Sequence, residues 1–247
     1  MPRINTNGVN TYYEDTGNGH PFVFIHGGHL ESSSWHSQVA HFPKSYRAIT
    51  YDIRGHGRSE VPDEGYAIGE CVEDLRQLLD HLAAERAYLA GLSMGGYIAL
   101  TFTLVHPERV DALILAGTNS GPVIETLRKK GDEKAAKLRS KGTDSAKNFV
   151  KAHEANVARP DLTERLSEIR RPVLIIVGDQ DTITPRYISK VMHREIADSR
   201  MVVLPNCGHR CHEKQPDTFN SIVSDFLKKT EAVGGSTCPA LKHCTTS

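Results

Sequence analysis

Short, nearly uninterrupted apolar runs alternate along much of this chain with longer segments in which apolar residues recur at helical spacing. The apolar runs, at residues 22–25, 46–52, 87–90, 110–116, 171–178 and 201–205, predict strands. The segments of helical spacing lie at residues 34–42, 68–82 and 96–105. Because strands that are apolar throughout are buried on both faces, the pattern predicts an α/β fold, a mostly parallel sheet with helices on both faces.

The helical pattern is clearest within residues 68–82, whose apolar side chains share one face: Val72, Leu75, Leu78, Leu79 and Leu82. The N-terminal residues show a different pattern. Residues 3–6 and 9–14 flank Asn7-Gly8, a pair that favours a tight hairpin turn. The chain is therefore expected to begin with two antiparallel strands.

Residues 118–170 break the alternation of strands and helices. They contain no apolar strand and read as several polar helices, punctuated by Gly121, Gly131, Gly142 and Pro160. We expect an α/β core made of residues 1–117 and 171–230, with the helices of residues 118–170 forming a small lid inserted in that core. Residues 231–247 end in a stretch rich in Gly, Ser and Thr and are expected to be a disordered tail.

The sequence Gly91-Leu92-Ser93-Met94-Gly95 lies between an apolar strand and an apolar helix. Glycines at 91 and 95 leave room for a tight strand-to-helix turn, which lifts the serine hydroxyl clear of the sheet. The first N–H groups of the helix then point toward whatever the serine attacks. We therefore expect Ser93 to be a nucleophile rather than a simple helix cap.

A serine nucleophile needs a base, and the base needs an orienting group. Asp181 and His209 each lie just beyond the end of a predicted strand further along the chain. Open α/β sheets place their functional sites at these carboxyl ends of the strands. The order Ser93, Asp181, His209 is also that of one known triad architecture. These three residues are therefore predicted to form a catalytic triad.

At these residues the chain resembles the α/β-hydrolase family, over residues 1 to about 230. Besides the serine turn, the likeness rests on three stretches. They are residues 22–28, similar to the strand and loop that supply an oxyanion-hole donor; residues 51–59, similar to a D-x-R-G-x-G-x-S turn; and residues 208–216, similar to the catalytic-histidine loop and following helix. The resemblance implies the α/β-hydrolase fold with a helical lid and a serine esterase or lactonase activity.

Two of the triad positions have rivals. Asp179 is a second candidate acid, but in the family the acid ends a G-x-x-D run, and residues 178–181 match that run with Asp181 as the acid. His212 is a second candidate base, but it falls at the start of the next helix rather than in the loop after the strand. The resemblance therefore favours Asp181 and His209.

The resemblance also implies an oxyanion hole and a substrate pocket. The backbone N–H groups of Gly28 and Met94 are expected to bind the oxyanion. Six lid residues are expected to face the main domain: Val123, Ile124, Leu127, Phe149, Val150 and Val157. Of these, Val123, Ile124, Leu127 and Phe149 are expected to line the pocket together with His29. The alternative for these lid residues is that they only seal the lid onto the core. His26, Asp52, Arg54 and His56 are expected to brace the neighbouring loops rather than to take part in the chemistry.

A serine with an oxyanion hole suits acyl transfer, so we expect hydrolysis of small carboxylic esters or lactones through an acyl-enzyme intermediate. The chain resembles the group of 3-oxoadipate enol-lactonases and acyl-homoserine lactonases in particular. One alternative is hydrolysis of a carbon–carbon bond in ring-cleavage products, although relatives of that kind usually carry Asn where this chain has Leu92. Another is a non-enzymatic ligand receptor built on the same fold.

The charges of the chain balance, with 30 Lys plus Arg and 30 Asp plus Glu, so neither nucleic acid nor a membrane is an expected partner. The first residues lack the apolar core of a signal peptide, and no segment approaches the roughly 20 apolar residues of a membrane span. A cytoplasmic monomer or homodimer is expected. Cys207 and Cys211 bracket His209 without a second ligand pair, so no metal and no cofactor is expected.

The lid is basic. It carries Arg128, Lys129, Lys130, Lys134, Lys137, Arg139, Lys141, Lys147 and Lys151, opposed within that stretch by Asp132, Glu133 and Asp144. A solvated helix face accounts for such a run of charges. The alternative is attraction of an anionic substrate, an effect that added salt would screen.

Overall fold

Eight strands form one sheet, in the order β1-β2-β4-β3-β5-β6-β7-β8, in the computed structural model, which describes residues 2–234. The strands are β1 (Arg3–Thr6), β2 (Val9–Thr16), β3 (His20–Ile25), β4 (Tyr46–Tyr51), β5 (Ala87–Leu92), β6 (Val110–Ala116), β7 (Val173–Gly178) and β8 (Ser199–Leu204). The pairs β1–β2 and β2–β4 are antiparallel, and the other neighbours are parallel. The predicted hairpin and the predicted mostly parallel sheet are both confirmed.

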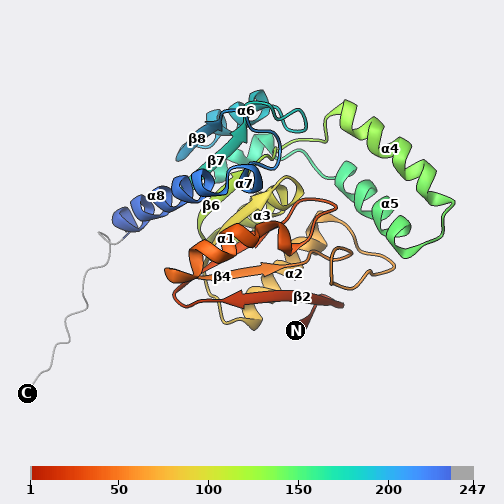
Figure 1. The fold of residues 1–247 in the computed structure, drawn as a ribbon, viewed down its shortest axis with the longest axis horizontal. Coiled ribbons are helices and arrows are strands. Elements are labelled where there is room, and N and C mark those ends of the chain that lie inside the picture. The colour runs from red at the N-terminus through yellow and green to blue at the C-terminus, as the bar shows by residue number, and fades with distance from the viewer. Residues whose placement is uncertain (1, 235–247) are drawn as a thin grey trace, which may run out of the picture.

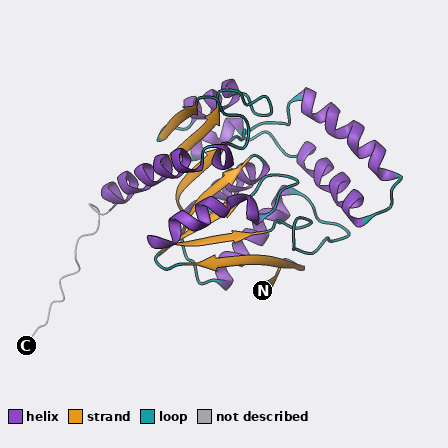
Figure 2. Ribbon diagram, in the orientation of Figure 1, coloured by secondary structure: helices purple, strands orange, loops and turns teal. Residues whose placement is uncertain are grey.

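Helices cover both faces of this sheet (Figure 2). They are α1 (His36–His41), α2 (Ile68–His81), α3 (Met94–Val105), α4 (Glu125–Arg139), α5 (Asp144–Val157), α6 (Arg186–Glu195), α7 (Cys211–Lys214) and α8 (Pro216–Gly234), with 3-10 turns at Ser32–Trp35, Phe42–Lys44, Pro107–Arg109 and Thr163–Glu168. The sequence pattern did not predict α6, in which Ser189 and Met192 are the buried residues. Ile188, Val191 and Met192 nevertheless recur at helical spacing, so a local signal for this helix was present in the sequence.

The strands send alternate side chains into two separate cores. In β6, Leu113 and Leu115 join the cluster that contains the apolar face of α2 and most of α3, whereas Ile114 points to the opposite face. There it packs in a cluster that includes Trp35 and Phe219. Burying one such aliphatic or aromatic side chain contributes roughly 1.5–3 kcal/mol. Burial on both faces explains why the strands read as continuous apolar runs.

The sheet order decides where the loops that follow the strands meet. From β3 the chain crosses to β4 on one side, and it later returns to β5 on the other side of β3. The strands from β3 and β4 through β8 are parallel, so the loops after β3, β5, β6, β7 and β8 leave the same edge of the sheet. A reversal of strand order of this kind leaves a crevice for ligands outside the carboxyl ends.

The segment between β6 and β7 holds α4 and α5, which pack against each other as a pair beside the sheet (Figure 1). We call residues 118–170 the lid. The α5 side chains of Asn148 and Lys151 donate hydrogen bonds to backbone oxygens of the core, at Gly55 and Asp63 respectively. The lid is therefore joined to the core by polar contacts as well as by its two connecting chains.

The helix α8 extends further than the sequence indicated. It continues through residues 231–234, which we had assigned to a disordered tail beginning at residue 231. Glu231 explains the difference, because its carboxylate accepts hydrogen bonds from the hydroxyls of Tyr46, at 3.0 Å, and Tyr88, at 3.3 Å. The rest of the expected tail, residues 235–247, lies outside the described residues. Within the described part of the chain, no helix combines the length and apolar character needed to span a bilayer.

Candidate active site

Ser93 occupies a strained turn between β5 and α3, with φ of 52° and ψ of −116°. A residue with a side chain avoids positive φ, and holding it there costs on the order of 1–3 kcal/mol. Neighbouring hydrogen bonds hold this turn: the Ser93 N–H donates to Ala116 O at 3.0 Å, and the Thr118 hydroxyl donates to Ser93 O at 2.6 Å. Residues at the end of the adjacent strand β6 and just after it therefore hold the strained backbone of Ser93 in place.

Two glycines make the turn possible. A Cβ at Gly91 would overlap the backbone of Gly95 in α3, and a Cβ at Gly95 would overlap the backbone oxygen of Ile25 in β3. The helix thus starts in backbone-to-backbone contact with the sheet. This close approach sets the Ser93 side chain at the carboxyl edge of β5.

Asp181 and His209 meet after the ends of β7 and β8. The His209 ring donates from Nδ1 to Asp181 Oδ2 at 2.9 Å. With the proton on Nδ1, the neutral ring keeps a lone pair on Nε2, the tautomer that a general base requires. The close contact is permitted by Gly117, where a Cβ would come 3.2 Å from His209 Nδ1 and 3.4 Å from Asp181 Oδ2.

The carboxylate of Asp181 is held by further donors. The backbone N–H groups of Ile183 and Thr184 donate to Oδ1 at 2.8 and 2.9 Å, and the Thr184 hydroxyl donates to Oδ2 at 2.8 Å. Burial by itself would raise the pKa of Asp181, but the bonds from His209 and Thr184 outweigh it and lower that pKa below its ordinary value. Asp181 is therefore an anion at neutral pH and accepts the hydrogen bond from His209 Nδ1.

The two rival residues lie elsewhere. The Asp179 carboxylate accepts a hydrogen bond from the Cys207 N–H at 3.1 Å and is solvent-exposed. His212 is fully buried, and its ring centroid lies 4.2 Å from that of Trp35. Neither residue lines the cavity at Ser93. Burial lowers the pKa of His212 to about 3, so its ring is neutral and packs as part of the core.

Ser93 and His209 open into one cavity of about 370 Å³ between the core and the lid. We call it the inner cavity. All five expected pocket residues line it, namely His29, Val123, Ile124, Leu127 and Phe149. These lid side chains therefore contribute to the walls of a cavity and do more than seal the lid onto the core.

The two expected oxyanion donors also line the inner cavity, beside Ser93. Gly28 follows β3, and a Cβ on it would lie 3.6 Å from the Met94 sulfur, so the two residues are neighbours. Met94 is the first residue of α3, where a backbone N–H has no acceptor within the helix. Both backbones are therefore placed beside the serine.

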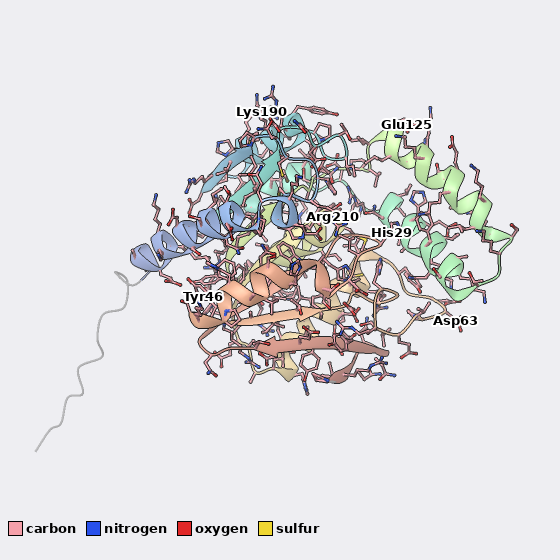
Figure 3. The ribbon with its side chains drawn as sticks, in the orientation of Figure 1. His29, Tyr46, Asp63, Glu125, Lys190 and Arg210 are labelled. Atoms are coloured by element: carbon pink, nitrogen blue, oxygen red, sulfur yellow. The ribbon has the colours of Figure 1, made fainter. Side chains whose placement is uncertain are left out.

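A wider cavity of about 750 Å³ adjoins the inner one, and both share His29, Lys134 and Phe149 in their walls. We call it the outer cavity. The His29 and Phe149 rings stack with their centroids 4.2 Å apart and their planes at 15°. Figure 3 shows His29 on the side of the core that faces the lid. Burial, with smaller contributions from nearby cations, lowers the pKa of His29 to about 4, so this stack is neutral at physiological pH.

The residues expected to brace the neighbouring loops do so. His26 is fully buried; its Nδ1 bonds Gly27 O at 2.8 Å and its Nε2 accepts from the Ile53 N–H at 2.9 Å. Asp52 accepts from the N–H groups of Ser32, at 2.6 Å, and Arg58, at 2.7 Å. These bonds tie the loop that carries Gly28 to the end of β4.

Arg54 forms a buried ion pair with Asp74 of α2, through bonds of 2.6 and 2.7 Å. His56 bonds the backbone oxygen of Arg54 at 3.0 Å through Nδ1. None of these bonds involves the serine or its partners, so the turn after β4 is structural.

Several polar residues at the site were not anticipated from the sequence: Thr118, Asn119, His153, Asn156, Arg159 and Thr184. Thr184 had a local signal, since a Thr three residues after an Asp is a common turn partner. Arg159 and Asn119 had none, because they are 40 residues apart and meet only through the fold. Among the described residues, no group of three or more His, Cys, Asp or Glu side chains is arranged to hold a metal ion.

Comparison with known proteins identifies the family of the chain. The family model of the alpha/beta hydrolase fold matches residues 20–160, and a second model, for TAP-like protein, matches residues 143–238. The first match spans more than half of the chain. The chain therefore belongs to the alpha/beta hydrolase family.

Individual relatives are hydrolases of several kinds. The chain is 30% identical to 3-oxoadipate enol-lactonase 2 of Acinetobacter baylyi, covering 80% of this chain and 84% of that protein. It is also 30% identical to a 2-hydroxy-6-oxononadienedioate/2-hydroxy-6-oxononatrienedioate hydrolase of Burkholderia vietnamiensis, covering 90% and 92%. Its fold matches that of a thermophilic esterase from Thermogutta terrifontis with a TM-score of 0.86 at 26% identity, covering 93% and 99%.

Proposed function

We propose that this protein is a serine hydrolase that cleaves small carboxylic esters or lactones through an acyl-enzyme intermediate. One observation carries the proposal: Ser93, in a strained strand-to-helix turn, shares a cavity with His209, whose other ring nitrogen is bonded to Asp181. A serine, a histidine and a carboxylate in this relation form the machinery of acyl transfer.

In the proposed reaction, His209 Nε2 removes the Ser93 proton as Ser93 Oγ bonds to the substrate carbonyl carbon. The carbonyl oxygen becomes an oxyanion, which the N–H groups of Gly28 and Met94 stabilise. The bond to the leaving oxygen then breaks, and the proton passes from His209 to that oxygen. A water molecule attacks the resulting ester in the same way and releases the acid and free Ser93. Asp181 stabilises the imidazolium that forms in each half of the reaction.

The size of the inner cavity supports a small substrate. Its volume of about 370 Å³ lies at the lower end of the range for ligand pockets, roughly 300–1,000 Å³. The relatives that hydrolyse esters and lactones support the reaction class. In a lactone the leaving oxygen stays attached to the acyl group, so hydrolysis yields one product instead of two.

Hydrolysis of a carbon–carbon bond is the second candidate, because the matched protein of Burkholderia vietnamiensis is named as such a hydrolase. The residue before the serine separates the two reactions. Leu92 is fully buried in the core cluster on the α8 side of the sheet and has no polar atom to offer a substrate. We therefore favour the ester or lactone reaction.

Hydrolysis of p-nitrophenyl acetate and butyrate tests the proposal. We expect measurable turnover by the natural chain and a loss on the order of 10⁴-fold or more in Ser93→Ala. Ser221→Ala, at an exposed position on α8, is the matched control and should keep full activity. A fluorophosphonate should add one adduct mass to the natural chain and none to Ser93→Ala. Full activity in Ser93→Ala would overturn the proposal.

A panel of esters and lactones of increasing acyl length, followed by proton release, assigns the substrate type. A ring-cleavage product with a ketone at the scissile carbon is added to the same panel. Turnover of that ketone at a higher kcat/KM than every ester and lactone would reverse the choice between the two reactions.

A further inference from the structure

Arg159, just after α5, is a buried cation in the wall of the inner cavity. Only 8% of the residue is exposed, yet it lines the cavity into which Ser93 and His209 open. A buried guanidinium is costly unless an anion accompanies it, by several kcal/mol even after the protein relaxes. The partners of Arg159 therefore decide what this residue does.

Every hydrogen-bond acceptor of Arg159 within the described residues is neutral. Its Nε donates to Gly121 O at 3.2 Å, one terminal nitrogen donates to Asn156 Oδ1 at 2.9 Å, and the other donates to Asn119 Oδ1. Its guanidinium carbon lies 4.3 Å from the centre of the Tyr97 ring, a cation–π contact. These contacts orient the guanidinium without compensating its charge.

Arg54 provides a contrast within the same molecule. It is also buried, but it faces the Asp74 carboxylate through two hydrogen bonds. Burial lowers the pKa of Arg159 to about 10, so Arg159 remains charged at neutral pH. Arg54 is therefore paired within the chain, whereas Arg159 carries a positive charge that its protein partners leave uncompensated.

The charged side chains that line the inner cavity are cationic, and the Asp181 carboxylate lies behind His209 and Thr184. Lys130 and Lys134 of α4 line it together with Arg159, and no Asp or Glu is among the described residues of its wall. The outer cavity differs, because Glu31 and Glu213 stand in its wall beside Lys134 and Arg210, so its charges balance. An anionic group on a substrate is therefore attracted to the inner cavity more strongly than to the outer one.

We propose that Arg159 is the binding residue for a carboxylate on the acyl part of the substrate, so that this pocket selects half-esters or lactones of dicarboxylic acids. The planar fork of a guanidinium matches a carboxylate in a way that a lysine does not. The leaving group then lies toward the outer cavity. The selection of substrates for hydrolysis rests on the proposed hydrolase function, whereas the binding of a carboxylate by Arg159 does not.

The kinetic test compares two esters of similar size, mono-p-nitrophenyl glutarate, which carries a carboxylate, and p-nitrophenyl pentanoate, which does not. In the natural chain we expect kcat/KM to be about 10–100-fold higher for the glutarate ester, the range of a charge-assisted hydrogen bond. Arg159→Gln should reduce this ratio at least about tenfold, through a higher KM for the glutarate ester, and Arg159→Lys should restore part of it. Mono-p-nitrophenyl succinate and adipate are one methylene shorter and longer than the glutarate ester. Their kcat/KM values therefore report the distance between Ser93 and the site that binds the carboxylate.

Lys137→Gln is the matched control. Lys137 is on the same basic helix α4, is exposed, and lines neither cavity. It should keep both the activity and the ratio. Equal loss of the ratio in Lys137→Gln and Arg159→Gln would assign the preference to the general field of the lid and overturn the role of Arg159.

Binding is measured separately, in the Ser93→Ala protein, by calorimetry with glutarate and with its neutral diamide. We expect glutarate to bind, the diamide to bind at least tenfold more weakly, and Arg159→Gln to abolish the difference. If esters are hydrolysed with no preference and glutarate binds no better than the diamide, the carboxylate assignment fails while the hydrolase function stands. If no ester is hydrolysed but glutarate binds through Arg159, the hydrolase function fails while the carboxylate assignment stands.

Folding of Arg159→Gln is checked by its melting temperature and circular dichroism. If that variant does not fold, the comparison of glutarate with its diamide in the natural chain still decides whether the cavity prefers an anion, and Arg159→Lys decides whether the guanidinium is responsible.

Discussion

The sheet and the lid are packed in different ways. Every residue of β5 and β7 is buried, and the loops after these strands carry Ser93 and Asp181. In α4 of the lid, Ala135 is the buried apolar residue, and the rest of its described side chains are at least partly exposed. The two lid helices meet at Gly131, where any side chain would overlap the His153 ring.

This difference in packing corresponds to different roles of the core and the lid. The proposed reacting groups stand on strands that are fixed on both faces, where a small displacement would be costly. The walls of the inner cavity come mainly from the lid, whose helices α4 and α5 bury few apolar side chains, although Leu162, Leu166 and Ile169 near its end pack in the core. Substitutions in the core should therefore abolish the chemistry or the fold, whereas substitutions in the lid should change which substrates are accepted.

The largest expected effect is on the core side of this comparison. Asp181→Asn should lower kcat/KM by about 10⁴-fold, because the amide no longer holds the His209 tautomer or stabilises its cation. Asp179→Asn is the matched control, since that carboxylate bonds the Cys207 N–H. Its kcat/KM should stay within about threefold of the natural value. Steady-state hydrolysis of p-nitrophenyl butyrate measures both, and equal losses would contradict the assignment of Asp181.

The second effect compares glycines in the two regions. Gly95→Ala should destabilise the protein by at least about 3 kcal/mol, because the new methyl group meets the backbone of β3, which cannot move aside. Gly142, between α4 and α5, has φ of 66° and open space around it. Gly142→Ala should cost only the backbone strain, about 1–2 kcal/mol. Urea unfolding measures both, and a smaller loss in Gly95→Ala than in Gly142→Ala would show that the core is the more adaptable region.

The third effect is the pH dependence of core stability. Burial lowers the pKa of His26 and of His212 to about 3, whereas an unfolded histidine titrates near 6.5. Between these values the unfolded chain binds protons that the folded chain excludes, so the free energy of unfolding falls as the pH falls. Each histidine contributes up to about 1.4 kcal/mol per pH unit.

Urea unfolding at pH 6, 5.5 and 5 measures this slope. His212→Leu should reduce the slope by about 1.4 kcal/mol per pH unit, whatever its effect on stability at pH 7. An unchanged slope in the variant would mean that the His212 ring takes up a proton in the folded protein.

The smallest effect is expected in the lid. Phe149→Ala removes the ring that stacks on His29 between the two cavities. We expect KM for p-nitrophenyl butyrate to rise about three- to tenfold, with little change in kcat, because binding is lost equally in the ground and transition states. Val157→Ala, in α5 but in neither cavity wall, should leave KM unchanged. A large loss of kcat in Phe149→Ala would place this ring in the reaction itself.

The fold was predictable because its signals are local. Strands buried on both faces have continuous apolar sequences, and the face of α2 repeats at helical spacing, so β3 to β8 and α2 were evident from the sequence. The helix α6 was missed, although Ile188, Val191 and Met192 carry the helical spacing that would have revealed it. The end of α8 was also misplaced, because the bonds from Tyr46 and Tyr88 to Glu231 join residues more than a hundred positions apart.

The candidate site likewise has a part that the sequence predicted and a part that only the tertiary structure revealed. The sequence alone determined that Ser93, Asp181 and His209 follow strands, and parallel strands bring their carboxyl ends to one edge whatever the loops contain. Only the tertiary structure decided that His209 bonds Asp181 while Asp179 bonds a backbone N–H. It alone left Arg159 buried with neutral partners beside the serine. Periodicity reports which face of a segment meets water, but the pairing of charges depends on which distant segments the fold brings together.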